Sequence, residues 1–212
     1  MKRSADFVFW ISLAAFALLS AAAGARLLHP IDAWVLHMTQ SRASEGLDAA
    51  GEIFSVPGTA EYSGVALLML AAGLFFVGRR SLAGRILAAF LITGLLEFAM
   101  KTWLPQLPVP EDAARSTDPS PLLEAEAPHP YPSGHMLRAV ILLGAISVLW
   151  PSKILRAAIL VCLIGLAVSR VYLGGHWVSD VIGGALLGIA GLAWAFRQEA
   201  RGYRHRQEKA ET

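Results

Sequence analysis

The sequence has few charged residues. Only 16% of its 212 residues are Asp, Glu, Lys or Arg, whereas 55% are hydrophobic. Soluble domains usually carry about 25% charged residues, so this composition argues against a soluble protein. The formal net charge of +2 is too small to indicate a partner among the nucleic acids. Membrane lipid is therefore the partner that the composition favours, and no protein partner is indicated.

Cysteine is almost absent. The single Cys162 cannot form an internal disulfide, and one thiol does not make a metal site. It lies within an apolar stretch, where a cysteine behaves as a small buried hydrophobic residue. The sequence also shows no internal repeat and no low-complexity tract.

Long apolar stretches are what the sequence does contain. Six can be marked off: Phe7–Ala25, Tyr62–Gly78, Ile86–Met100, Met136–Trp150, Leu155–Val168 and Val178–Phe196. A helix needs about 20 residues to cross the hydrocarbon core, and the middle stretches reach that length only with flanking residues. We predict an all-α polytopic membrane protein, with six transmembrane helices in one bundle that forms a single domain over residues 1–212. The first stretch is too long for the apolar region of a signal peptide, so we expect it to be a retained helix.

Positive charges are distributed unevenly between the two sets of helix ends. Twelve of the 18 lysines and arginines lie on the side that includes both termini, and the other six lie on the opposite side. By the positive-inside rule the richer side is cytoplasmic. We therefore expect loops 26–61 and 104–132 outside and a basic tail, 197–212, in the cytoplasm. A bacterial inner membrane is the simplest location.

The two long outer loops differ in composition. Loop 104–132 holds eight of the 11 prolines. Proline removes backbone donors, so irregular, exposed structure is expected there. Loop 26–61 contains two short apolar runs, Ile31–Met38 and Leu47–Phe54, which could form helices lying in the membrane interface.

Polar clusters lie at the predicted outer ends of four helices, where a membrane-spanning helix has no structural need for them. They are Lys101 at the end of the third span, Pro132-Ser133-Gly134-His135 with Arg138 at the start of the fourth, Ser169-Arg170 at the end of the fifth, and Gly174-Gly175-His176 with Asp180 at the start of the sixth. We expect these residues at one depth, on one side of the bundle, at the outer ends of helices 3 to 6.

The residue types in these clusters suit a phosphate. Ser133 is well placed as a helix N-cap, and Gly134 allows the backbone to approach a ligand closely. Backbone amides at a helix N-terminus form an anion site. Lys101 and Arg170 supply positive charge, and a guanidinium matches the geometry of phosphate oxygens.

The spacing of the two histidines also indicates catalysis. His176 and Asp180 are four residues apart, so a helix places them on one face. The aspartate can then hold one imidazole nitrogen, which leaves the other available as a nucleophile. His135 and Arg138 are three apart and likewise share a face.

Two segments resemble known signature motifs. Pro132-Ser133-Gly134-His135 and the run Ser169-Arg170-(five residues)-His176-(three residues)-Asp180 are similar to the second and third motifs of the type 2 phosphatidic acid phosphatase (PAP2) superfamily. Six spans with motifs at outer helix ends resemble its membrane-bound lipid phosphatase branch. The resemblance implies a phosphatase that needs no metal and no cofactor.

The resemblance also implies roles for individual residues. His176 would attack phosphorus and become a phosphohistidine, with Asp180 orienting it. His135 would protonate the leaving oxygen and then activate water. Phosphate oxygens would be held by Lys101, Ser133, Gly134 and Arg170.

The first family motif is incomplete in this chain. That motif is a lysine, six residues, then Arg-Pro, but counting from Lys101 gives Pro108-Val109. Arg115 or Arg138 could replace the missing arginine. We favour Arg138, because a helix fixes its direction whereas Arg115 lies in the proline-rich loop.

Other polar and small residues have structural interpretations. Glu97 is four residues before Lys101, which predicts a helix-face ion pair rather than a catalytic role. The glycines at positions 183, 184, 188 and 191 predict close packing of the last helix.

The sequence therefore predicts a phosphatase for a lipid phosphate or diphosphate of the outer leaflet. Isoprenyl diphosphate, phosphatidic acid, phosphatidylglycerol phosphate and a lipid A-type phosphate all fit. Transfer of the phosphate to an acceptor other than water is an alternative. A non-catalytic lipid-phosphate binding or transport protein is another, although binding alone needs no nucleophile. Vanadate-dependent oxidation is a third, but the superfamily members known for it are soluble.

Overall fold

A computed structural model describes residues 2–115 and 128–197. The centre of the proline-rich loop and all but the first residue of the predicted basic tail lie outside the described residues. The described residues form helices and no strand: α1 (Lys2–Gly24), α2 (His29–Gln40), α3 (Glu45–Ser55), α4 (Ala60–Phe76), α5 (Arg80–Trp103), α6 (Gly134–Leu149), α7 (Lys153–Tyr172) and α8 (Val178–Phe196), with the short 3-10 turns Val56–Gly58 and Glu111–Ala113.

Each of the six predicted apolar stretches falls in a separate helix, with at most two residues beyond its end, and the all-helical class is confirmed for the described residues. Within residues 2–115 and 128–197, five segments are long and apolar enough to cross a membrane: Ser4–Gly24, Glu45–Phe76, Arg80–Trp103, Lys153–Tyr172 and Val178–Phe196. The predicted fourth span, α6, is apolar but has only 16 residues. The number of six crossings therefore stays a prediction.

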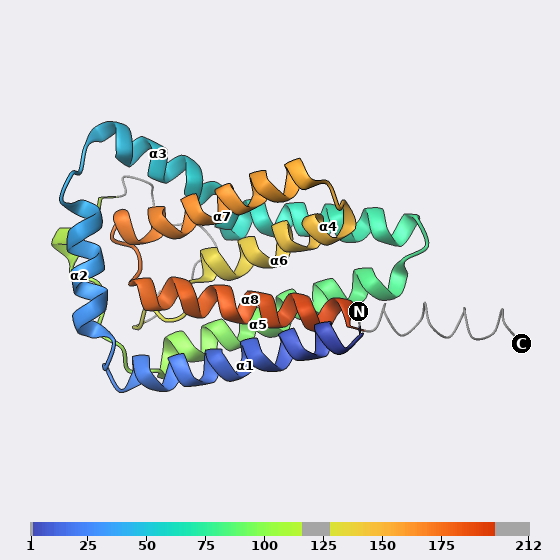
Figure 1. The fold of residues 1–212 in the computed structure, drawn as a ribbon, viewed down its shortest axis with the longest axis horizontal. Helices are drawn as coiled ribbons and strands as arrows, with labels where there is room; N and C mark the ends of the chain where they lie inside the picture. Colours follow the sequence, from blue (N-terminus) through green and yellow to red (C-terminus); the bar gives the residue numbers. More distant parts are fainter. Residues whose placement is uncertain (1, 116–127, 198–212) are drawn as a thin grey trace, which may run out of the picture.

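The long helices run along one axis, and α2 lies across one end of the bundle (Figure 1). Next to it, α3 leads back along the bundle and packs on α7, while α2 packs on α7 and α8. These two helices contain the short apolar runs predicted in loop 26–61, so their helical structure is confirmed. Their position in a membrane interface stays a prediction.

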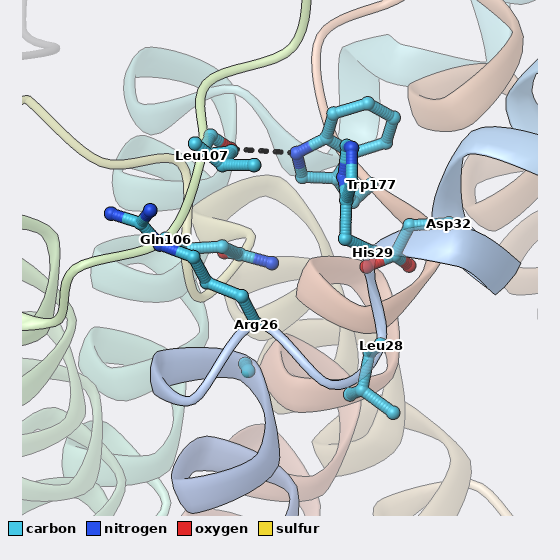
Figure 2. A pocket seen from close by; sticks show the side chains of 8 residues that line it. Arg26, Leu28, His29, Asp32, Gln106, Leu107 and Trp177 are labelled. Carbon is cyan, nitrogen blue, oxygen red and sulfur yellow. Dashed lines mark hydrogen bonds between the residues drawn. The ribbon is translucent and has the colours of Figure 1, made fainter.

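The turn from α1 into α2 borders a small pocket (Figure 2). Arg26 has a φ of 60° in this turn, a left-handed conformation that reverses the chain sharply. The pocket is lined by Ala23, Arg26, Leu28, His29, Asp32, Gln106, Leu107 and Trp177. The indole N–H of Trp177 donates to the Leu107 carbonyl at 2.8 Å, which fastens the segment after α5 to the start of α8.

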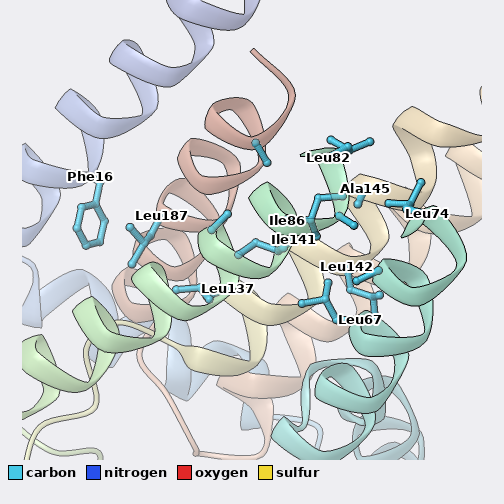
Figure 3. Close-up of a cluster of buried hydrophobic side chains, with 14 of the residues drawn as sticks. Phe16, Leu67, Leu74, Leu82, Ile86, Leu137, Ile141, Leu142, Ala145 and Leu187 are labelled. Carbon is cyan, nitrogen blue, oxygen red and sulfur yellow. The ribbon is translucent and has the colours of Figure 1, made fainter. Parts of the chain in front are cut away.

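The core lies between α1, α4, α5, α6 and α8 (Figure 3). Its buried side chains include Phe16, Leu67, Leu74, Leu82, Ile86, Leu137, Ile141, Leu142, Ala145 and Leu187. Large apolar side chains also lie on the outside of the bundle, and Phe76 and Ile154 are each 84% exposed. An apolar outer surface is what a helix bundle in lipid needs.

Glycines on α8 bring it close to the segment that enters α6. A Cβ at Gly184 would overlap the carbonyl oxygen of Ser133, and a Cβ at Gly188 would lie 2.9 Å from the carbonyl oxygen of Leu137. A Cβ at Gly183 would lie 2.6 Å from the buried Tyr131 ring. The predicted role of these glycines in close packing is confirmed, and it sets the distance between the starts of α6 and α8.

Candidate active site

The four polar clusters lie at the same end of the bundle (Figure 1). There α5 and α7 end and α6 and α8 begin. The structure thus brings together the helix ends that carry the predicted site residues. Their position on the outer side of a membrane stays a prediction.

Asp180 lies in the first turn of α8, and His176 lies two residues before the helix begins. Asp180 is fully buried, and its Oδ2 accepts the backbone N–H of Trp177 at 2.9 Å. The same oxygen lies 3.3 Å from Nδ1 of His176, which is also buried. The carboxylate thus contacts the imidazole and the backbone of the residue beside it, so the ring direction is tied to the first turn of the helix.

The Ser133–Gly134 backbone lies against this pair. The backbone N–H of Ser133 donates to the carbonyl of Asp180 at 2.9 Å, which joins the start of α6 to the start of α8. Ser133 is the N-cap residue of α6 but makes no side-chain capping bond. Its hydroxyl is buried and has no hydrogen-bond partner within the described part of the chain. Amides and a hydroxyl at a helix N-terminus together suit an anion.

His135 follows in the first turn of α6 and is buried. The turn before α4 packs closely on it, because a Cβ at Gly58 would lie 2.8 Å from the Cβ of His135. The position of His135 is therefore fixed by its helix and by this neighbouring turn.

Glu97 connects two of the predicted phosphate-binding cations. Its Oε1 lies 3.0 Å from Nζ of Lys101, which confirms the predicted helix-face pair. Its Oε2 lies 3.4 Å from Nη1 of Arg138, on α6. A Cβ at Gly134 would overlap Glu97 and lie 2.8 Å from Nη1 of Arg138. Lys101, Arg138 and Gly134 are thus gathered around one buried carboxylate.

Arg170 lies next to His176. The backbone N–H groups of Gly175 and His176 both donate to the carbonyl of Arg170, at 3.2 and 3.1 Å. A Cβ at Gly175 would lie 2.5 Å from Nη2 of Arg170, so only glycine leaves room for the guanidinium there. The turn between α7 and α8 therefore places the Arg170 guanidinium against Gly175, the residue before His176.

Arg115 lies in a different set of interactions. Its guanidinium makes two bonds of 2.9 Å to the carboxylate of Asp48 and lies over the Tyr172 ring. Tyr172 also donates to Asp48 at 2.6 Å. This cluster fastens α3 to the end of α7. Of the two candidates for the missing arginine, Arg138 is the one that the structure places beside Gly134.

The sequence pattern that defines the PAP2 superfamily matches residues 64–204. The chain belongs to the PAP2 superfamily. The matched region contains all eight predicted site residues, from Lys101 to Asp180. It begins within α4, so α2 and α3 lie before the region that defines the family.

Two solved structures resemble the fold. The transmembrane PAP2 type phosphatidylglycerolphosphate phosphatase from Bacillus subtilis matches with a TM-score of 0.73 and 20% identity, over 94% of this chain and 97% of that one. LpxE from Aquifex aeolicus matches with a TM-score of 0.54 and 22% identity, over 74% of this chain and 90% of that one. At 20% and 22% identity, the similarity to these two structures shows the fold alone. No match was found among curated protein sequences.

Because Arg138 and Arg115 have different partners, activity measurements can decide which of them replaces the missing arginine in this PAP2 protein. We expect Arg138→Ala to lower kcat/KM for a lipid phosphate by about 10- to 100-fold, because a charged hydrogen bond contributes roughly 1.5–3 kcal/mol. Arg115→Ala should change kcat/KM less than about twofold, because its partner is Asp48, although it should lower the melting temperature. Phosphate release by both purified variants measures this. A larger loss of activity in Arg115→Ala, or no loss in either variant, would show that Arg138 does not replace the missing arginine.

Sequence analysis missed two residues near the site. Asp32, on α2, accepts hydrogen bonds from Ser179 in the first turn of α8. Gln106 donates to the same serine at 3.1 Å. Neither belongs to a local motif, and Asp32 is 147 residues from its partner. Only the folded arrangement of α2 against α8 reveals them.

Proposed function

We propose that this protein is a metal-independent phosphatase that hydrolyses a lipid phosphate or lipid diphosphate through a phosphohistidine. One observation carries the proposal. The His176–Asp180 pair is bonded through the Ser133 backbone to a helix N-terminus that lies beside Lys101 and Arg138. A histidine held by a carboxylate thus lies next to a helix N-terminus with nearby cations, an arrangement that supports phosphoryl transfer.

The first step transfers the phosphoryl group to His176. With its Nδ1 proton directed to Asp180, the imidazole presents Nε2 as the nucleophile. Nε2 attacks phosphorus, the P–O bond to the lipid breaks, and His135 gives its proton to the leaving oxygen. The α6 amides and the nearby cations stabilise the charge that develops on the phosphate oxygens.

The second step releases phosphate. His135, now neutral, takes a proton from water while the water oxygen attacks phosphorus. The P–N bond breaks, inorganic phosphate forms, and His176 regains its neutral state. Both histidines finish in their starting protonation states, so each cycle consumes one water.

The surroundings of the site support a lipid substrate. The site lies at the end of a bundle whose outer surface is apolar, where acyl chains can lie beside the helices. The similar structure from Bacillus subtilis is a phosphatidylglycerolphosphate phosphatase. Phosphatidylglycerol phosphate, phosphatidic acid, isoprenyl diphosphate and a lipid A-type phosphate are the substrates to compare, presented from the outer leaflet.

A panel assay tests the proposal. Detergent-purified protein is incubated with EDTA and each lipid phosphate or diphosphate, and inorganic phosphate is measured. We expect release from at least one lipid at a rate that EDTA does not change. Activity that disappears with EDTA and returns only with a divalent cation contradicts the metal-independent mechanism.

The same assay separates the alternatives. Loss of lipid phosphate without equal release of inorganic phosphate, in the presence of an added alcohol, indicates phosphotransfer to that acceptor. Binding of the lipids without turnover by folded protein favours the binding or transport function. In that case the histidines would have no catalytic role.

A further inference from the structure

Asp32 is a buried carboxylate outside the predicted site. It belongs to α2, the helix that lies across the end of the bundle, and it is only 1% exposed. Its Oδ1 accepts the backbone N–H of Ser179 at 2.9 Å, and its Oδ2 accepts the Ser179 hydroxyl at 2.8 Å. Both carboxylate oxygens therefore bind the first turn of α8.

This turn contains Asp180, and His176 lies two residues before it. The first N–H groups of a helix have no partner within the helix, so an acceptor must come from elsewhere. Asp180 accepts the N–H of Trp177, and Asp32 accepts that of Ser179. The helix start is thus capped by one carboxylate of its own and by a second that α2 supplies.

Other contacts converge on the same turn (Figure 2). Gln106 donates to the Ser179 hydroxyl at 3.1 Å. The His29 ring packs edge-on against Trp177, with the ring centroids 5.4 Å apart. Figure 2 shows Gln106, His29 and Trp177 around the small pocket at the α1–α2 corner. Trp177 and Ser179, which follow His176 in the chain, are thereby held by segments outside α8.

Burial of the Asp32 carboxylate affects its pKa. Burial raises the pKa of Asp32, whereas the hydrogen bonds from Ser179 and the neighbouring His29 lower it. Burying a carboxylate is unfavourable unless hydrogen bonds compensate. Here Ser179 supplies two such bonds, so the two residues depend on each other.

We propose that Asp32 is a positioning residue for the phosphoryl transfer, acting through Ser179 to fix the first turn of α8 and the direction of the His176 imidazole. The inference rests on the proposed function. Asp32 does not touch the reacting atoms in this scheme. It makes α2, which precedes the family-defining region, part of the machinery that orients the nucleophile.

Three variants test it in the phosphate-release assay. We expect Asp32→Ala to lower kcat by about 10- to 100-fold, because a misplacement of about 1 Å costs roughly that much. KM should change by less than about threefold, since the phosphate-binding residues are untouched. Asp32→Asn should retain most of the activity, because its Oδ1 still accepts the Ser179 N–H. Asp48→Ala is the matched control. It removes a carboxylate that anchors α3 in a comparable way, but that does not contact α8.

A double-mutant cycle with Ser179→Ala tests whether Asp32 acts through Ser179. It measures the rate of phosphoenzyme formation, which a merely structural role of Asp32 does not change. If Asp32 acts through Ser179, the two substitutions together should lower the rate of phosphoenzyme formation by much less than the product of their single effects. If Asp32→Ala does not fold, Asp32→Asn and Ser179→Ala are compared with Asp48→Ala in the phosphate-release assay. Ser179→Ala should then lower kcat and leave KM nearly unchanged.

The possible failures are distinguishable. Absence of phosphate release by the wild type overturns the proposed function and this inference with it. An active wild type with a folded Asp32→Ala variant of unchanged kcat overturns the positioning role alone. Equal losses in Asp32→Ala and Asp48→Ala, or effects of Asp32 and Ser179 that multiply, overturn it as well.

Discussion

Phosphate release should fall by about 10³-fold or more when His176 is replaced by alanine, since loss of a nucleophile removes the covalent route. The geometry gives the reason, because His176 is the histidine whose Nδ1 lies 3.3 Å from a buried carboxylate. The measurement compares wild type and His176→Ala at matched folded concentration, on the best lipid of the panel. The variant should also form no phosphoenzyme.

His37→Ala is a suitable control for this experiment. His37 is exposed on α2 and belongs to none of the contacts described around the site. Its replacement should leave the rate within about twofold, as surface substitutions usually do. If His176→Ala keeps a tenth of the wild-type rate or more while folded, the phosphohistidine mechanism is wrong.

Replacement of His135 by alanine should have an effect that depends on the leaving group. Lipid alkoxides are poor leaving groups, so loss of the general acid should lower turnover by about 10²- to 10⁴-fold. An aryl phosphate with an acidic phenol needs no protonation, and its first step should proceed. The second step still lacks its base, so phosphohistidine should accumulate. Quenched-flow detection of the acid-labile phosphoenzyme measures this.

The double variant His135→Ala/His176→Ala is the control, because it should form no phosphoenzyme from the aryl phosphate. A His135→Ala variant that hydrolyses both substrate types at the wild-type rate contradicts the acid–base role. Equal losses on both substrates, without accumulation of phosphoenzyme, place His135 in phosphate binding or in folding instead.

The helices and the clustering of motif residues were predictable because both depend on local patterns. An apolar run of about 20 residues indicates a helix wherever it occurs. The spacing of four residues correctly predicted a contact between His176 and Asp180, but not its geometry, because His176 lies two residues before α8 and Asp180 reaches it from the first turn of the helix. The Glu97–Lys101 pair follows from the same rule, and the structure confirms it at 3.0 Å.

The contacts that assemble the site were not predictable, because they join distant segments. Glu97 reaches Arg138 across 41 positions, Arg115 reaches Asp48 across 67, and Ser179 reaches Asp32 across 147. A single sequence has no signal for such pairs. The sequence favoured Arg138 over Arg115 because a helix fixes its direction, but it gave no sign that Asp48 holds Arg115 or that Arg138 lies beside Gly134.

The packing of the first helix on the last has a consequence for biogenesis. More of α1 lies against α8 than against any other described helix, and Ser20 of α1 bonds the hydroxyl of the buried Tyr131. At about 5–20 residues per second, synthesis reaches α8 roughly 10–30 s after α1 is made. During that interval Ser12 and Ser20, buried in the finished bundle, must face lipid or a chaperone. The first helix is therefore made long before its principal partner, and the bundle closes only after α8 has been synthesised.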